Sequence, residues 1–201
     1  MKFRIQTNGA VANALRRIIT SEIKTYAIEI TAIRHNTSSL LDDMVAHRLG
    51  LIPIRVLDEL RMEKEEGIIV LKCENNKTTK QYIYTNDLVY DHTLYEINPN
   101  ILLFELREGQ YIDLKCEVTQ GTGYEHAKWS PVYAISCVPA KNEGGDKGGD
   151  EGDEECKDYI IDINSVGQIP QEKEILAKAL EILENKIQII IKHRIKTDGS
   201  K

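Results

Sequence analysis

The segment from Pro170 to His193 constrains the fold most, because apolar residues recur along it at helical spacing. Pro170 suits the first turn of a helix, and Glu172 and Glu174 favour the positive end of the helix dipole. A chain of 201 residues has too little other surface to cover so long an apolar helix. We therefore expect it to pack against a partner helix from another subunit. The apolar face comprises Leu176, Ala179, Leu180, Leu183, Ile187, Ile190 and Ile191.

A second amphipathic helix is predicted from about Ala10 to Lys24. Asn8 and Gly9 supply a cap and a turn before it. By composition alone, Arg16 and Arg17 read as part of an ordinary solvated face. The apolar stripe comprises Val11, Leu15, Ile18, Ile19 and Ile23, and the opposite face carries Asn13, Arg16, Arg17, Thr20 and Lys24.

The middle of the chain reads as one short helix followed mainly by strands. The helix is predicted from Ser39 to Leu49, with Ser38 or Ser39 as its cap and Gly50 as the left-handed residue after it. Pro53 prevents its continuation. Together with the two longer helices, these elements predict an α+β fold. Strands are expected at Tyr26–Ile33, Gly67–Cys73, Lys80–Tyr84, Ile101–Leu106, Gln110–Val118, Val132–Val138 and Tyr159–Ile163.

The charge of the chain is concentrated in one segment. The formal net charge is −6, and eight acidic residues against three lysines between Lys141 and Asp158 account for −5 of it. Residues 141–157 also contain five glycines and almost nothing apolar, so we expect a disordered loop there. The net charge argues against a protein that grips nucleic acid over its whole surface. Because the remainder is close to neutral, the global charge says little about partners.

The sequence indicates no membrane segment. No run approaches the roughly 20 apolar residues of a membrane span, and no charged start leads into an apolar signal region. We therefore expect an intracellular protein, and the sequence does not choose between cytoplasm, nucleus and virion.

Motifs that carry chemistry are missing from the sequence. It contains no phosphate-binding glycine loop, no HExxH and no GxSxG, so we predict no catalytic residue. None of its four cysteines forms a CxxC pair, and Cys73 and Cys116 lie in strand-like runs where a thiol is usually a small buried hydrophobe. Asp42 and Asp43 diverge on a helix and read as a solvated first turn. We predict no metal and no cofactor.

Two histidines and the single tryptophan remain as candidates for interaction. His47 lies near a helix end beside Arg48, where packing or an interface is a better interpretation than catalysis. Trp129 follows Lys128 in a loop that begins at His126. This tryptophan fits an interface anchor and a plug at the end of a sheet equally well.

Four motifs in order resemble the alpha-like subunits of multisubunit DNA-dependent RNA polymerases, the family of bacterial alpha, archaeal D and the eukaryotic third subunit. Asn13 to Ile18 reads NALRRI, and Ala46 to Pro53 reads AHRLGLIP. Glu125 to Pro131 reads EHAKWSP. The pair Ile169-Pro170, followed by ALEIL at 179–183, is similar to the dimerisation helix that ends the family's core.

The resemblance implies a non-catalytic subunit that serves as an assembly platform for the polymerase. A discontinuous dimerisation domain, a sheet with two helices, would comprise residues 1–30 and 158–201. A mostly β insert domain would occupy 31–157. The first and last helices would pack on a smaller alpha-like subunit of the archaeal L or eukaryotic eleventh-subunit type, and the pair would then dock the large catalytic subunits. Nucleic acid would be met only indirectly, through the complex.

The resemblance also assigns roles to single residues. Arg16 and Arg17 would contact the second-largest subunit. His47, Arg48 and the loop from His126 to Trp129 would meet that subunit or the small zinc-binding subunits. Residues 54–71 contain no Cys, so the zinc loop of many eukaryotic members is not expected here. The expected subunit-interface residues are Asn13, Leu15, Arg16, Arg17, His47, Arg48, His126, Lys128, Trp129, Leu176, Leu180, Leu183 and Ile187.

A second function remains open on the sequence alone. The same fold could serve as a free-standing adaptor that binds a transcription regulator outside the polymerase. Archaeal, viral and other reduced polymerases all fit the short chain, and the partner could be a separate chain or a second copy.

Overall fold

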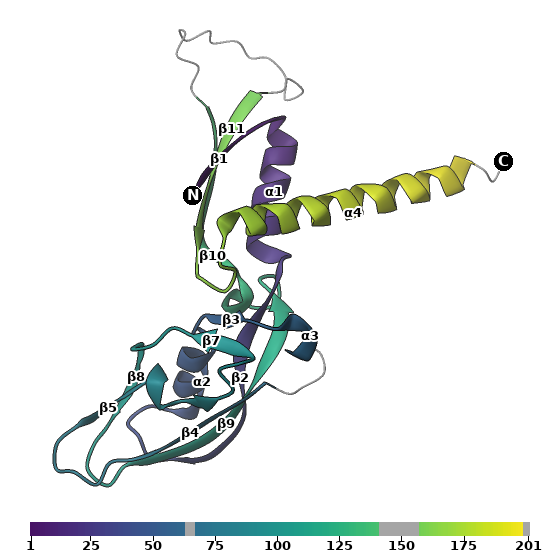
Figure 1. Ribbon diagram of the computed structural model, residues 1–201. Helices are drawn as coiled ribbons and strands as arrows, with labels where there is room; N and C mark the ends of the chain where they lie inside the picture. The colour runs from purple at the N-terminus through teal and green to yellow at the C-terminus, as the bar shows by residue number, and fades with distance from the viewer. Residues whose placement is uncertain (63–66, 141–156, 199–201) are drawn as a thin grey trace. The chain divides into compact units, whose positions relative to one another are not determined.

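The computed structural model describes residues 1–62, 67–140 and 157–198, with side chains of the last helix described up to His193. The chain forms two compact units (Figure 1). One comprises residues 1–23 and 122–201, and the other comprises residues 24–121. The predicted α+β class is confirmed, since both units combine strands with helices.

The unit that contains both termini is a three-stranded antiparallel sheet with two helices. Its strand order is β1-β11-β10, so the late strand β11 lies between the first strand and β10. The helices α1 and α4 cross each other and pack on the sheet (Figure 1). The bounds are β1 Lys2–Thr7, α1 Gly9–Ser21, the short helix η2 Ala127–Trp129, β10 Val132–Pro139, β11 Lys157–Ser165 and α4 Glu172–Asp198.

The helix α1 forms where the sequence predicts it. The Asn8 side chain accepts a hydrogen bond from the Val11 backbone N–H at 2.9 Å and so caps the first turn. The buried face of α1 meets Ile161 and Ile163 of β11 together with Ile175 and Ala179 of α4. One apolar core therefore joins the beginning and the end of the chain. The buried residues of α1 are Ala12, Leu15, Ile18 and Ile19.

The unit of residues 24–121 is mostly β structure. Its largest sheet has the order β2-β9-β4-β6, and two strand pairs, β3 with β7 and β5 with β8, complete it. The helix α2 packs on β2 and β8. The bounds are β2 Lys24–Asn36, α2 Asp42–Gly50, β3 Ile54–Val56, α3 Glu59–Met62, β4 Ile68–Glu74, β5 Gln81–Tyr84, η1 Thr85–Asp87, β6 Val89–Tyr90, β7 Tyr95–Ile97, β8 Leu102–Leu106 and β9 Tyr111–Thr122.

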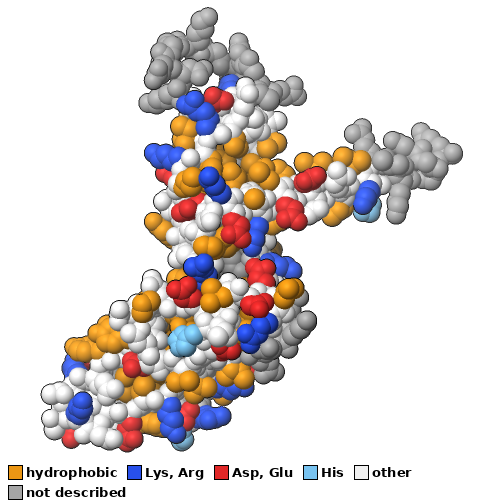
Figure 2. Space-filling model, in the orientation of Figure 1, with side chains coloured by type: hydrophobic (Ala, Val, Ile, Leu, Met, Phe, Trp, Pro, Cys, Tyr) orange, Lys and Arg blue, Asp and Glu red, His pale blue; other side chains and the backbone are white. Residues whose placement is uncertain are grey.

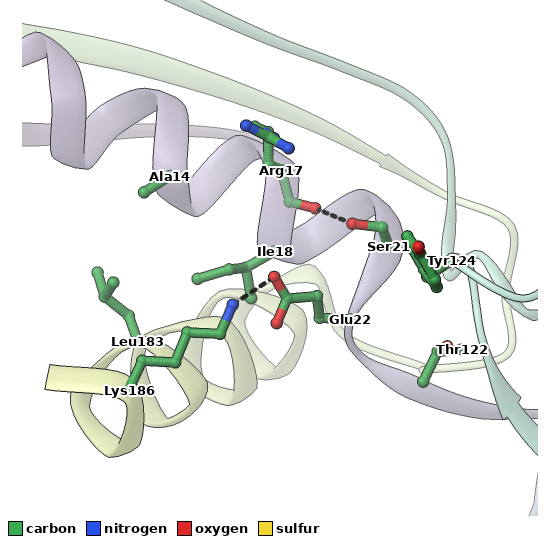
Figure 3. Close-up of a pocket in the computed structure, with 9 residues that line it drawn as sticks. All are labelled: Ala14, Arg17, Ile18, Ser21, Glu22, Thr122, Tyr124, Leu183 and Lys186. Carbon is green, nitrogen blue, oxygen red and sulfur yellow. Dashed lines mark hydrogen bonds and ion pairs between the residues drawn. The ribbon is translucent and has the colours of Figure 1, made fainter. Parts of the chain in front are cut away.

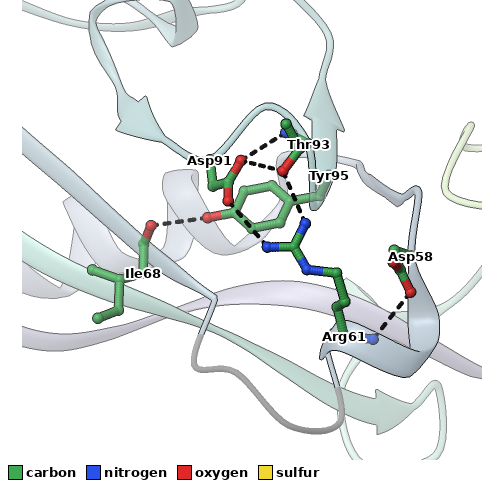
Figure 4. Close-up of polar contacts among 6 residues, drawn as sticks. All are labelled: Asp58, Arg61, Ile68, Asp91, Thr93 and Tyr95. Carbon is green, nitrogen blue, oxygen red and sulfur yellow. Dashed lines mark hydrogen bonds and ion pairs between the residues drawn. The ribbon is translucent and has the colours of Figure 1, made fainter.

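In this second unit, a cluster of polar contacts lies beside the buried Tyr95 (Figure 4). The Tyr95 hydroxyl donates a hydrogen bond to the Ile68 carbonyl at 2.9 Å, which satisfies its one polar atom. The Arg61 guanidinium donates to the Thr93 hydroxyl at 3.1 Å and lies 3.6 Å from the Asp91 carboxylate. Hydrogen bonds from the Thr93 hydroxyl and backbone N–H lower the pKa of Asp91. These contacts fasten the turn before β7 to α3.

The predicted caps of α2 are wrong at both ends. Its N-cap residue is Leu41, without a side-chain hydrogen bond, and Asn36 organises the preceding turn by accepting from Ser38 and donating to Asp42. Gly50 is the last residue of α2. Among the described residues, the glycines with positive φ are Gly109 and Gly167, so a left-handed Gly50 is also incorrect.

Two further expectations differ from the structure in their boundaries. Pro170 precedes α4, which begins at Glu172 and continues to Asp198, beyond the expected end at His193. The strand β10 pairs with β11 in the unit of the two termini, whereas the sequence places it within an insert of residues 31–157. Residues 141–156 of the expected loop lie outside the described residues, and Lys157 already belongs to β11.

Gly123 is required by a close approach of two backbones. A Cβ atom at this position would lie 2.2 Å from the Thr20 carbonyl oxygen at the end of α1. The Tyr124 N–H donates to the Ser21 carbonyl at 2.9 Å, which holds the two segments together. A methyl group cannot enter without separating them.

Gly123→Ala is therefore expected to lower the free energy of unfolding by about 2 kcal/mol or more. Urea denaturation followed by circular dichroism measures the change. Gly9→Ala is the matched control, because its Cβ would meet only the flexible Tyr159 side chain, with the hydroxyl at 3.0 Å. Equal stability of the two variants would contradict the close approach.

Burial of Cys116 in the sheet core predicts a loss of stability at high pH. Burial raises the pKa of the Cys116 thiol to about 12. Between roughly pH 9 and pH 11 the unfolded chain releases this proton and the native chain keeps it. The group therefore lowers the free energy of unfolding by about 1.4 kcal/mol per pH unit in that window. Cys116→Ala should flatten the measured pH dependence by this amount, and an unchanged slope would contradict the assignment.

Candidate subunit-interaction surfaces

The helix α4 carries an open apolar face. Its 27 residues extend about 40 Å at the usual helical rise, and α1 crosses only its first part (Figure 1). Hydrophobic side chains lie along the described part of α4 in Figure 2. Leu176 and Leu183 pack partly on the core, whereas Leu180 is 48% and Ile187 47% exposed. The remaining exposed hydrophobic residues of the helix are Ile189, Ile190 and Ile191.

The spacing of this face is that of a helix-packing seam. Leu176, Leu180, Leu183, Ile187 and Ile190 follow one another at alternating intervals of four and three. Such a heptad pattern presents one stripe to a neighbouring helix. The predicted apolar face is therefore present on α4, and its distal part is uncovered in the chain alone.

A groove lies between α1 and α4 beside this seam (Figure 3). It has a volume of about 640 Å³, and Ala14, Ile18 and Leu183 line its apolar part. At one end the Lys186 ammonium lies 2.5 Å from the Glu22 carboxylate, an ion pair that joins the two helices. The groove is also lined by Arg17, Ser21, Thr122 and Tyr124.

The two arginines of the first helix have different surroundings. The Arg16 guanidinium donates to the Asn13 side-chain oxygen at 2.9 and 3.3 Å, so Asn13 orients it along the helix surface. The exposed Arg17 instead lines the groove. Leu15 is buried in the core, where it supports α1 without reaching the surface. The sequence predicted one role for both arginines, and the structure places them on different sides of α1.

The loop with Trp129 is held in a defined shape. His126 Nδ1 accepts a hydrogen bond from the Lys128 N–H at 3.0 Å, and the Lys128 ammonium lies 4.3 Å from the Trp129 ring centre. The Gln168 side chain donates to the Lys128 carbonyl at 3.0 Å. Trp129 is half-buried, so its role as an anchor or as a plug stays a prediction.

The remaining candidates, His47 and Arg48, lie on α2 in the unit of residues 24–121. His47 is exposed. The Arg48 guanidinium donates to the carbonyl oxygens of Leu103 at 2.6 Å and Leu102 at 2.9 Å, so it fastens α2 to β8. A fold-stabilising contact for Arg48 was not predicted. Its partners are backbone atoms, which leave no signal in the sequence.

The candidate residues thus fall into three surfaces: the α1–α4 face, the His126–Trp129 loop and α2. The ion pair of Glu22 with Lys186 and the lining residue Tyr124 were missed by the sequence analysis. Within the described ranges, no group of three or more His, Cys, Asp or Glu residues could hold a metal ion. No helix in the same part of the chain is long and apolar enough to cross a membrane.

Comparison with known proteins decides the family. The family described as the RNA polymerase Rpb3/RpoA insert domain matches residues 28–131. The chain belongs to the alpha-like subunits of DNA-directed RNA polymerase. This membership confirms the resemblance carried by the four motifs and the prediction of a structural subunit.

Relatives from archaea and eukaryotes carry corresponding names. The Rpo3 subunit of DNA-directed RNA polymerase from Methanocaldococcus jannaschii is 34% identical over 92% of this chain and 85% of the relative. The rpac1 subunit of RNA polymerases I and III from Dictyostelium discoideum is 36% identical over 82% of this chain, but the match spans only 57% of that relative. The RPB3 subunit of RNA polymerase II from Schizosaccharomyces pombe is 29% identical over 92% and 80% of the two chains.

Two substitutions on α2 test whether Arg48, unlike its exposed neighbour His47, contributes to the stability of the fold. Arg48→Ala should lower the free energy of unfolding by about 1–3 kcal/mol, because two backbone carbonyls, one part-buried and one exposed, lose a charged donor. The neighbouring exposed substitution His47→Ala should change it by less than about 0.5 kcal/mol. Thermal or urea denaturation measures both. Equal effects would show that the Arg48 contacts contribute nothing to the fold.

Proposed function

We propose that this alpha-like subunit is an assembly platform of a DNA-directed RNA polymerase. In this role it pairs with a smaller alpha-like subunit and then docks the large catalytic subunits. The observation that carries the proposal is the seam from Leu176 to Ile190, three of whose five residues lie exposed on a helix that extends beyond its own core. Exposed apolar stripes of this length are typical of surfaces that a partner covers.

The proposal places the smaller subunit on the α1–α4 face. A helix laid along the seam would bury Leu180 and Ile187 and would fill the groove lined by Ala14 and Ile18. Each fully buried leucine or isoleucine contributes about 1.5–3 kcal/mol. Apolar burial along the seam is therefore the main contribution to the proposed complex, since the exposed ion pair of Lys186 with Glu22 joins two helices of this chain and contributes at most about 1 kcal/mol to their packing.

The other two surfaces are proposed docking points for larger neighbours. Arg16 and Arg17 suit acidic groups of the second-largest subunit, since arginine binds carboxylates through two parallel hydrogen bonds. His47 and the loop with Trp129 suit that subunit or the small zinc-binding subunits, because a half-buried tryptophan with a cation over it is a common interface anchor. Within such a complex the subunit works inside the cell and meets nucleic acid only through its neighbours.

Leu180→Glu tests the proposed heterodimer. A carboxylate placed in an apolar helix seam loses its hydration without gaining a partner, which costs several kcal/mol. The variant, co-expressed with the smaller alpha-like subunit of the same organism, should elute from gel filtration as separated chains. The control Asn185→Glu, on the opposite exposed side of α4, should elute as the complex. A normal complex with Leu180→Glu would exclude the seam as the interface.

A further inference from the structure

The strand β10 forms one edge of the three-stranded sheet. Within the described ranges, its backbone pairs with β11 on one side and with no further strand on the other, which is here termed the open edge. All eight residues of Val132–Pro139 are uncharged. The other edge strand, β1, carries Lys2 and Arg4, and charged side chains discourage pairing with a further strand. The open edge of β10 lacks this protection, so it can accept an added strand.

The register of the sheet fixes which backbone groups face the open edge. The Ala140 N–H donates to the Asp158 carbonyl at 2.7 Å, so these two opposed residues form a hydrogen-bonded pair. Such pairs recur at every second residue of antiparallel strands. The even-numbered residues of β10 from Ala134 onward therefore bond to β11. Ile135 and Cys137 consequently turn their N–H and C=O groups toward the open edge.

Two further observations agree with this register. The Ile163 N–H donates to the Met1 carbonyl at 2.9 Å, so the odd-numbered residues of β11 bond to β1 and leave the even-numbered ones for β10. Pro139, which has no N–H, occupies an odd position of β10. Proline is tolerated in a sheet where its nitrogen faces away from the neighbouring strand. The open edge therefore ends at Pro139 and offers complete donor and acceptor pairs before it.

A positive charge lies beside the open edge. The helix α1 packs mainly against β10, and the side chains of Ile135 and Cys137 point to that side of the sheet. Burial raises the pKa of the Cys137 thiol, and the positive charge of Arg16 opposes this shift, which agrees with a guanidinium close to the strand. Asn13 holds Arg16 in place through the hydrogen bonds described above. Among the described residues, no carboxylate forms an ion pair with Arg16.

The opposite face of β10 is apolar at the same level. Val138 is 50% exposed and lies across from Ile160 of β11. Successive side chains of an added strand would point alternately to the two faces of the sheet. Those on one face would meet Arg16, and those on the other would meet Val138. The edge therefore suits an extended segment with an acidic residue on one face and apolar residues on the other.

We infer that β10 receives an added β-strand from the second-largest polymerase subunit, with an acidic side chain of that strand paired to Arg16. This inference rests on the proposed docking of Arg16 to that subunit and specifies how the contact is made. Backbone hydrogen bonds to Ile135 and Cys137 provide the attachment, and the charge pair selects the segment. The smaller alpha-like subunit is a poorer occupant, because its proposed groove is lined by Arg17 on a different side of α1.

Hydrogen exchange of single backbone amides tests the strand addition. The heterodimer with the smaller subunit is compared with the complex that also contains the second-largest subunit, by mass spectrometry at residue resolution. The amides of Ile135 and Cys137 should exchange about 100-fold or more slowly in the larger complex, because a bonded amide exchanges only when its bond opens. The Val138 amide, which bonds to β11, is the internal control and should be protected in both assemblies.

Charge reversal tests the pairing of Arg16. Arg16→Glu in the heterodimer should weaken binding of the second-largest subunit by about tenfold or more, since an attraction becomes a repulsion. Biolayer interferometry measures the dissociation constant. Arg4→Glu makes the same change of charge on the other edge strand and should stay within about twofold of the parent. Equal binding by the two variants would contradict the acidic partner of Arg16.

The outcomes separate this inference from the proposed function. If the larger complex forms and the amides of Ile135 and Cys137 exchange as they do in the heterodimer, the strand addition is wrong and the assembly platform stands. Protection of both amides already in the heterodimer would assign the edge to the smaller subunit and overturn the stated occupant. If the second-largest subunit does not bind the heterodimer, the proposed function fails and the inference fails with it.

Discussion

The packing of α4 on α1 and on the sheet is the contact on which the rest of this subunit depends. Ile175 and Ala179 of α4 are fully buried against a core that includes Leu15 and Ile19 of α1. Burial of one isoleucine contributes about 1.5–3 kcal/mol, which exceeds the contribution of an exposed ion pair such as that of Glu22 with Lys186. Apolar packing therefore fixes the crossing of the helices, and the ion pair adds a minor local restraint.

This crossing also explains how one chain can hold the proposed binding surface in a fixed position. The base of α4 is anchored in the core, so its position is defined before any partner arrives. The remaining length extends beyond α1 and keeps its apolar residues exposed (Figure 1). A preformed helix loses little conformational entropy when a partner covers it, which favours tight association. Arg16 and Arg17 lie on α1, which packs in the same core as the base of α4.

Much of this arrangement follows from the pattern of the sequence. The spacing of Leu15, Ile18 and Ile19 predicted α1, and the long apolar repeat predicted α4. The partner helix expected for α4 stays a prediction. Alternating residues predicted most strands of the unit of residues 24–121. The motifs from Asn13 to Leu183 predicted the family, which the comparisons then confirmed.

Two of the features that the sequence missed depend on contacts between residues far apart in the chain, and a third depends on a local turn. The fold contact of Arg48 was missed, because its guanidinium donates to two carbonyls that lie more than fifty positions away. Its role at an interface stays a prediction. The strand β10 reads as part of the insert, and only its pairing with β11 places it in the same sheet as the first strand. The predicted cap of α2 is wrong because Leu41 occupies the N-cap position instead of Ser38 or Ser39. The Asn36 side chain, six residues before the helix, makes the hydrogen bonds that hold the preceding turn.

The composition of the native complex tests the central claim most directly. The full chain, tagged and expressed in its own organism, is purified under native conditions and its complex is weighed by native mass spectrometry. The account predicts a stoichiometric assembly with a smaller alpha-like subunit and both large subunits of a DNA-directed RNA polymerase. Recovery with a transcription regulator and without the large subunits would contradict it, and would favour a free-standing adaptor.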